Sequence, residues 1–190
     1  MKLRFHNMER KRSFLYLIIS LLMVCSCADN VERRYAHIPA YFVFKNTNTV
    51  PQLNAALNNP GEFATITLDR NFYYFRNLTG ATQVNKTALN NYSSFKMGLG
   101  GFIVGLPNIP EPGADFAFVT CYDLTCSNCY RTYSITRSLS LLEGGYASCS
   151  NCQRTYNLNN QGSIVQGNSG INLFRYRVSH TNYILAIINQ

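Results

Sequence analysis

Two nearly identical ten-residue segments, each holding a Cys-x-x-Cys pair, limit what this sequence can fold into more than any other feature. CSNCYRTYSI starts at Cys126 and CSNCQRTYNL starts at Cys149, with 19 residues between Cys129 and Cys149. Two such pairs about 15–20 residues apart have the spacing of a tetrahedral four-thiolate metal site. The sequence therefore predicts one metal site with the ligands Cys126, Cys129, Cys149 and Cys152.

The geometry of a Cys-x-x-Cys turn, or knuckle, explains why the segment occurs twice. Such a turn presents two sulfurs to one ion, while its backbone N–H groups point at the sulfurs and ease their charge. Two knuckles related by a local pseudo-twofold axis would enclose the ion. Ser and Asn occupy both turns, where short polar side chains suit tight conformations. Thiolates favour zinc, or iron alone or in a cluster, and the choice between them stays open.

The other cysteines and the histidines leave one alternative to metal binding. No histidine lies near the knuckles, since His37 is at the start of the domain and His180 is expected in a solvated turn. Cys121 belongs to a strand of alternating apolar character and is expected to be a buried thiol or a reserve ligand. The alternative is disulfide bonding, because an exported protein can meet an oxidising compartment.

Residues 1–26 have the pattern of an export signal. Five basic residues precede an apolar stretch at 14–24, which has 11 residues where a membrane-spanning helix needs about 20. Its end, VCSC, is similar to the lipobox of bacterial lipoproteins, and this resemblance implies a lipid on Cys27 and a tether at 27–37. Cys25 fits less well, because Val24 would precede it where a small residue is preferred. An ordinary cleaved signal is the alternative.

This signal implies where the protein is located, and its removal lowers the net charge of the remaining chain. We expect a bacterial cell-envelope protein that is bound to the membrane through the lipid on Cys27, in the periplasm or at the outer membrane. The formal net charge is +8, but removing residues 1–26 leaves 12 basic and 8 acidic residues without a basic run. A nucleic-acid partner is therefore not expected. A redox partner or a surface protein partner is expected instead.

Residues 38–190 are expected to form a single, mostly β domain. Aromatic and β-branched residues predict strands, and Pro51 with the spacing of the following leucines predicts one short helix that stops at Pro60-Gly61. The polar segment 77–94 predicts a long loop, and 161–170 a hairpin. The predicted strands are 40–45, 63–68, 72–75, 101–105, 114–124, 171–178 and 182–188.

The order of motifs after Phe116 resembles the Rieske iron–sulfur fold. FAFVTCYDLTCSNC precedes the first loop, and YASCSNCQRTYNLNNQGSIVQGNSGINLFRYRV follows the Rieske order of a second loop, a Tyr-containing strand, a Gly hairpin and a closing strand. IPAYFVF, PGEFATI and GGFIVG look like a small group of bacterial lipoproteins with Rieske-like domains. The resemblance implies an antiparallel β-sandwich with a rubredoxin- or zinc-ribbon-like metal-binding subdomain at about 121–158.

The ligands depart from the Rieske pattern. A Rieske centre has two cysteines and two histidines. Here Cys126 and Cys149 match the cysteine ligands, while Cys129 and Cys152 stand where the histidines would be. The resemblance implies a [2Fe–2S] cluster with four cysteines, a single iron or a zinc.

Two functions follow from such a site, and neither is enzymatic. With iron, the domain would be an electron carrier, and with zinc or disulfides it would be a structural or surface-binding domain. We find no Ser-His-Asp set, paired carboxylates or phosphate-binding glycine loop in a credible context. The most that the sequence predicts in the way of enzyme chemistry is electron transfer.

Overall fold

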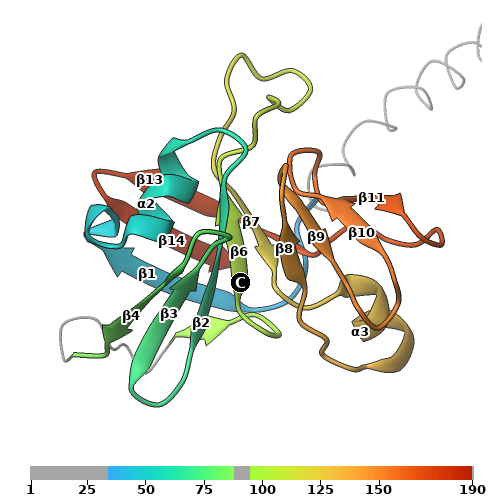
Figure 1. Ribbon diagram of the computed structural model, residues 1–190, viewed down its shortest axis with the longest axis horizontal. Coiled ribbons are helices and arrows are strands. Elements are labelled where there is room, and N and C mark those ends of the chain that lie inside the picture. Colours follow the sequence, from blue (N-terminus) through green and yellow to red (C-terminus); the bar gives the residue numbers. More distant parts are fainter. Residues whose placement is uncertain (1–33, 88–94, 190) are drawn as a thin grey trace, which may run out of the picture. The chain divides into compact units, whose positions relative to one another are not determined.

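The computed structural model describes residues 34–87 and 95–189, which are mostly β with antiparallel sheets (Figure 1). Residues from Tyr35 onward form one compact unit. The expected signal at 1–26, Cys25, Cys27 and most of the tether at 27–37 lie outside the described residues. Within the described part, no helix combines the length and apolar character that a membrane crossing needs.

The largest sheet has six antiparallel strands in the order β12-β7-β6-β2-β3-β4. Its members are β2 (Phe63–Leu68), β3 (Phe72–Arg76), β4 (Ala81–Asn85), β6 (Phe102–Gly105), β7 (Thr120–Asp123) and β12 (Arg175–Tyr176). Along β3, Tyr73 and Phe75 are buried while Phe72 and Tyr74 are partly exposed. The rings of this strand therefore alternate between partly exposed and buried positions.

A second sheet packs against the first and runs in the order β13-β14-β1-β5. Its strands are β1 (Ala40–Lys45), β5 (Lys96–Met97), β13 (Val178–Thr181) and β14 (Ile184–Asn189). Phe42 and Phe44 from β1 meet Tyr73 and Phe75 with ring centroids between 4.8 and 6.2 Å apart. We call the buried cluster that these rings share the large core.

The predicted short helix is α2 (Pro51–Asn58), which follows the 3₁₀ turn η2 (Thr47–Thr49). Pro51 occupies its first turn, where the missing N–H of proline costs nothing. Leu53 and Leu57 are buried against the large core because residues four apart share one helix face.

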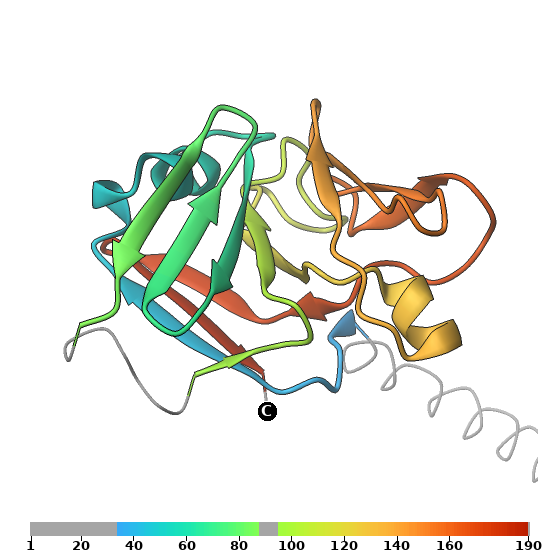
Figure 2. The ribbon, with the colours of Figure 1, turned by 60° about the horizontal axis from the view of Figure 1, so that its bottom comes forward.

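A third sheet carries the second knuckle between two of its strands, and the first knuckle lies at the start of a separate helix. The order of this sheet is β11-β10-β9-β8, and together with the helix α3 it forms what we call the knuckle lobe. The bounds are α3 (Ser127–Tyr133), β8 (Ser140–Leu142), β9 (Tyr146–Ser148), β10 (Thr155–Asn157) and β11 (Ser163–Gln166). Figures 1 and 2 both show this lobe beside the two larger sheets, with α3 at its lower edge in each view. Its own buried cluster includes Tyr122, Tyr156, Leu158 and three of the knuckle cysteines.

At the sheet edges, two segments differ from their predicted secondary structure. Only the last residues of 114–124 form a strand, β7, because its partner β6 ends at Gly105 and nothing pairs with the residues before Thr120. Phe116 and Phe118 are therefore 72% and 66% exposed. Conversely, the predicted loop at 77–94 contains β4, which pairs with β3 after a turn in which the Asn77 side chain accepts N–H groups from Thr79 and Gly80.

Three predictions near the knuckle lobe also need correction. The described residues contain two α-helices rather than one, because α3 begins inside the first knuckle. Residues 161–170 are not a hairpin, since β11 pairs with β10 instead. The strand at 171–178 is reduced to β12 and the start of β13, and His180 lies in β13, where its Nε2 is 3.1 Å from Thr47 Oγ1, rather than in a solvated turn.

Candidate metal centre

The fold brings the four predicted ligands together. The Sγ atoms of Cys126, Cys129, Cys149 and Cys152 all lie within 4.8 Å of one another. Two sulfur contacts cross between the knuckles, at 3.6 Å for Cys126 with Cys152 and at 3.7 Å for Cys129 with Cys149. Such a cluster of cysteines can bind a metal ion such as zinc or iron.

The two knuckles share one backbone pattern. Cys126 donates its N–H to the Arg137 carbonyl at 2.8 Å and accepts the N–H of Tyr130 at 3.0 Å. Cys149 donates to the Arg154 carbonyl at 2.9 Å and accepts the N–H of Gln153, also at 2.9 Å. The first cysteine of each knuckle thus starts a helical turn. Its N–H is bonded to a carbonyl of the segment that follows this turn and passes back alongside it. This common geometry explains the repeated sequence.

The knuckles differ in where that turn ends. In the first, the helix continues as α3 until Ser134, which has a left-handed backbone with φ of 55°. In the second, the left-handed residue is already Gln153, with φ of 56°, and the chain turns directly into β10. One copy of the repeat therefore gives a helix and the other a tight turn.

The Ser-Asn pair inside each knuckle has a different environment in each copy. Ser127 and Asn128 are buried and hold the segment that leads to β12: Ser127 Oγ accepts the Phe174 N–H at 2.8 Å. Asn128 exchanges two bonds with the backbone of Ile171, at 2.7 and 2.9 Å. In the second knuckle, Asn151 is exposed and its amide donates to Cys129 Sγ at 3.4 Å.

Tyr156 is a supporting residue that the sequence analysis did not identify. It is fully buried in β10, and its hydroxyl lies 3.2 Å from Cys126 Sγ while accepting the Asn128 amide at 2.9 Å. The repeat contains a signal for it, because RTY occurs in both copies. The equivalent Tyr133 is 64% exposed, so only the second copy uses its tyrosine at the sulfurs.

Burial and hydrogen bonding act in opposite directions on the pKa values of Cys126, Cys129 and Cys152. Burial raises the pKa of Cys126, against a hydrogen bond from Tyr156, and raises the pKa of Cys129 to about 12. At Cys152 burial also opposes ionisation, but hydrogen bonds from the side chain and backbone of Arg154 outweigh it and lower the pKa to about 7. Metal binding must therefore displace protons from the buried thiols.

Cys121 is not part of this cluster. It is fully buried on β7 within the large core, and burial raises the pKa of its thiol well above the usual range. The expectation of a buried thiol is confirmed, whereas the reserve ligand is not brought to the site. All five cysteines of the described residues are free, and contacts of 3.6 and 3.7 Å are far longer than a disulfide bond of about 2.05 Å.

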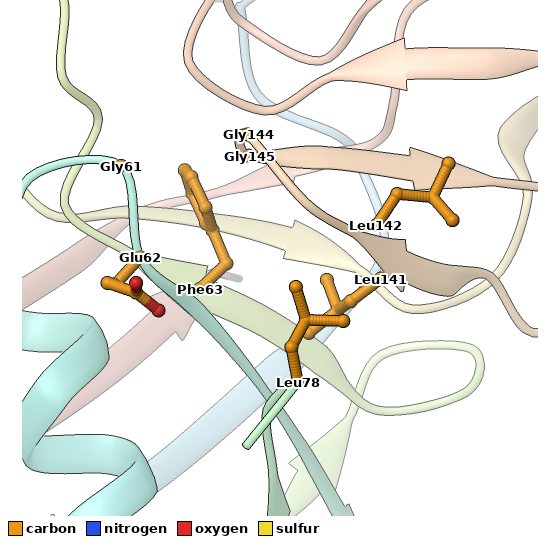
Figure 3. Close-up of a pocket in the computed structure, with 8 residues that line it drawn as sticks. All are labelled: Gly61, Glu62, Phe63, Leu78, Leu141, Leu142, Gly144 and Gly145. Atoms are coloured by element: carbon orange, nitrogen blue, oxygen red, sulfur yellow. The ribbon is translucent and has the colours of Figure 1, made fainter.

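A small pocket lies between β2 and the β8–β9 turn (Figure 3). Phe63, Leu78 and Leu141 line it, together with the turn glycines Gly144 and Gly145. Its volume is about 40 Å³. Ligand pockets usually measure about 300–1,000 Å³, so this one does not compete with the cysteine cluster as a functional site.

Comparisons of the chain with protein-family models, with curated proteins and with solved structures give no match. The functional argument therefore depends on the geometry of the cysteine cluster.

Proposed function

We propose that the four knuckle cysteines bind one zinc ion, which stabilises a non-catalytic domain of the cell envelope. The sulfur geometry carries this proposal. A tetrahedral ion with metal–sulfur bonds of about 2.3 Å holds its four sulfurs about 3.8 Å apart. The contacts of 3.6 and 3.7 Å match that edge, and no pair in the cluster is separated by more than 4.8 Å.

The same geometry argues against the [2Fe–2S] cluster that the Rieske resemblance implies. In such a cluster each iron takes two of the four protein ligands, and both irons with their bridging sulfides lie between the two ligand pairs. Sulfurs bound to different irons are then farther apart than the edge of a single tetrahedron. A cluster in which every sulfur lies within 4.8 Å of the others favours one ion.

A structural role follows from where the sulfurs lie. Cys126, Cys129 and Cys149 belong to the buried cluster of the knuckle lobe, whose sheet has strands of only three or four residues. Such a small lobe has little apolar surface to bury by itself. Structural zinc contributes about 10–16 kcal/mol of apparent binding energy, which becomes folding energy.

A single iron that carries electrons is the second candidate. One observation favours it: Cys152 is partly exposed, so one edge of the site faces solvent, where a redox partner would dock. Voltammetry of anaerobically reconstituted protein separates the two functions. A reversible one-electron wave, with a potential nearly independent of pH around neutrality because bound thiolates have no protons to lose, would support the carrier. A colourless protein without a wave supports the structural site.

The envelope location is proposed from the lipobox-like VCSC, with a lipid on Cys27 as the membrane anchor. The expected partner is a protein at the envelope, and the Rieske-like relationship is supported by the separate small sheet that carries the second knuckle. Labelling with a radioactive fatty acid tests the anchor. Cys27→Ser should abolish the label and Cys25→Ser should keep it, whereas an unlabelled wild type would remove the anchor from the proposal.

Serine substitutions test the metal site. Changing any one of Cys126, Cys129, Cys149 or Cys152 to Ser should remove most of the metal and lower thermal stability, because a three-thiolate site opens to water. Cys121→Ser is the control and should keep the metal, since its thiol lies in the large core. Unchanged metal content in all four variants would contradict the proposal.

A further inference from the structure

We propose that Cys152 is an oxidation-sensitive site at which a peroxide releases the metal ion. The sulfur of Cys152 is oxidised first, and Cys126 then closes a Cys126–Cys152 disulfide. This inference rests on the proposed metal site and adds a means by which its occupancy is regulated.

Solvent exposure determines which of the four sulfurs is oxidised first. Cys126, Cys129 and Cys149 are 0%, 1% and 1% exposed, whereas Cys152 is partly exposed. Two of the buried sulfurs also carry a neighbouring polar group, because Tyr156 lies against Cys126 and Asn151 against Cys129. An oxidant dissolved in water therefore meets Cys152 before the other three ligands.

The distance between sulfurs determines which thiolate then forms a disulfide with Cys152. Cys126 Sγ lies 3.6 Å from Cys152 Sγ, so a movement of about 1.5 Å gives the length of a disulfide bond. Cys149, which shares a knuckle with Cys152, instead contacts Cys129 at 3.7 Å. The disulfide is therefore expected to cross between the knuckles rather than to close within either Cys-x-x-Cys pair.

The chemistry balances with a peroxide as the oxidant. The Cys152 thiolate attacks one peroxide oxygen, the O–O bond breaks, and with one proton the products are a sulfenic acid and water. The Cys126 thiolate then attacks the Cys152 sulfur, the S–O bond breaks, and a second proton leaves with the oxygen as water. One peroxide is reduced by two electrons, two thiolates become one disulfide, and the ion loses half its ligands.

The Cys126–Cys152 disulfide explains how the knuckle lobe stays folded after the metal ion is released. The ion joins the start of α3 to the second knuckle, and a Cys126–Cys152 disulfide joins the same two segments. Reduction of the disulfide by a thiol restores both thiolates, so the site can bind its ion again.

Trypsin gives a direct test of the pairing. Cleavage after Lys96, Arg131, Arg137 and Arg154 places Cys121, Cys126 and Cys129 on peptide 97–131 and Cys149 and Cys152 on peptide 138–154. A disulfide within a knuckle stays inside one peptide, whereas Cys126–Cys152 links the two. Fragmentation of the linked pair identifies the cysteines.

The experiment uses the reduced, zinc-loaded full chain with stepwise additions of hydrogen peroxide. Released zinc is followed with a chromogenic chelator, and free thiols are blocked before digestion. We expect about one zinc released per peroxide consumed, with Cys126–Cys152 as the first disulfide. Cys121→Ser should behave like the wild type, and Cys126→Ala should accumulate a sulfenic acid on Cys152 that a dimedone probe traps.

Each other outcome has a defined meaning. A first disulfide within a knuckle, a Cys129–Cys149 pair, or a protein that keeps both its zinc and its thiols in excess peroxide would overturn this inference and leave the metal site standing. A chain that holds no metal but still forms Cys126–Cys152 first would overturn the metal site while supporting the order of oxidation.

Discussion

Single residues at the knuckles show that identical side chains in a repeat can have unequal roles. Tyr156 and Tyr133 occupy the same place in the two copies, yet Tyr156 is fully buried with its hydroxyl against Cys126 and Tyr133 is 64% exposed. A hydrogen bond to a sulfur ligand stabilises its thiolate form and orients the ligand. The phenol of Tyr156 is therefore expected to matter to the site and that of Tyr133 is not.

Phenylalanine substitutions at these two positions test the difference. Tyr156→Phe should lower the free energy of unfolding by about 1–3 kcal/mol and weaken metal binding, because the Asn128 amide and Cys126 each lose a contact with the buried hydroxyl. Tyr133→Phe should change either quantity by less than about 0.5 kcal/mol. Denaturant unfolding and competition with a chelator measure both, and equal effects would contradict the assignment.

At the scale of secondary structure elements, the first knuckle ties the metal site to the rest of the chain. Asn128 and Ser127 bond to Ile171 and Phe174, in the segment that leads from β11 to β12 of the six-stranded sheet. Gly170 fits beside this contact only because it has no side chain, since a Cβ there would lie 2.1 Å from Asn128 Oδ1. The second knuckle makes no such contact through Asn151.

Alanine substitutions at the two knuckle asparagines should therefore differ. Asn128→Ala removes a buried amide that makes three hydrogen bonds, and we expect it to cost about 2–4 kcal/mol of stability because the Ile171 backbone is left unpaired. Asn151→Ala loses one longer contact with Cys129 and should cost less than about 1 kcal/mol. Thermal and denaturant unfolding provide the comparison, and a larger effect at Asn151 would refute it.

At the scale of the whole molecule, the buried side chains form two clusters. One is the large core between the two larger sheets. The other lies between the knuckle lobe and the six-stranded sheet, because it combines the knuckle cysteines with Phe63, Ile103 and Tyr122 of β2, β6 and β7. Only the second includes the knuckle cysteines. Loss of the ion should therefore act on one part of the domain and leave the other folded.

Hydrogen exchange after chelation measures this separation. Removing the metal from reduced protein should abolish amide protection in β9, β10 and α3, while β2, β3 and β14 keep theirs. The physical reason is that the large core contains no ligand of the cluster. Uniform loss of protection would mean that the metal holds the whole domain together, and unchanged protection would mean that the ion stabilises neither cluster.

The sequence was sufficient where a local rule determines the structure. Spacing alone placed the four cysteines, and β1 and β2 have the predicted bounds because their buried residues follow a strand pattern. Prediction from the sequence failed where contacts with distant parts of the chain determine the secondary structure. α3 has a polar sequence without an apolar face, and the aromatic residues around Phe116 read as a strand although no neighbouring strand reaches them. The role of Tyr156 could not be separated from that of Tyr133 without the fold.

The metal content of the purified full chain, prepared anaerobically under reducing conditions, tests the central claim most directly. Elemental analysis with a visible absorption spectrum should give one zinc per chain and a colourless protein, because two sulfur contacts match the edge of a single tetrahedral site and all four sulfurs lie within 4.8 Å of one another. One iron with a red colour would support the single-ion site and would favour electron transfer as its function. Two irons with sulfide and a red-brown colour, or no metal at all, would contradict the account.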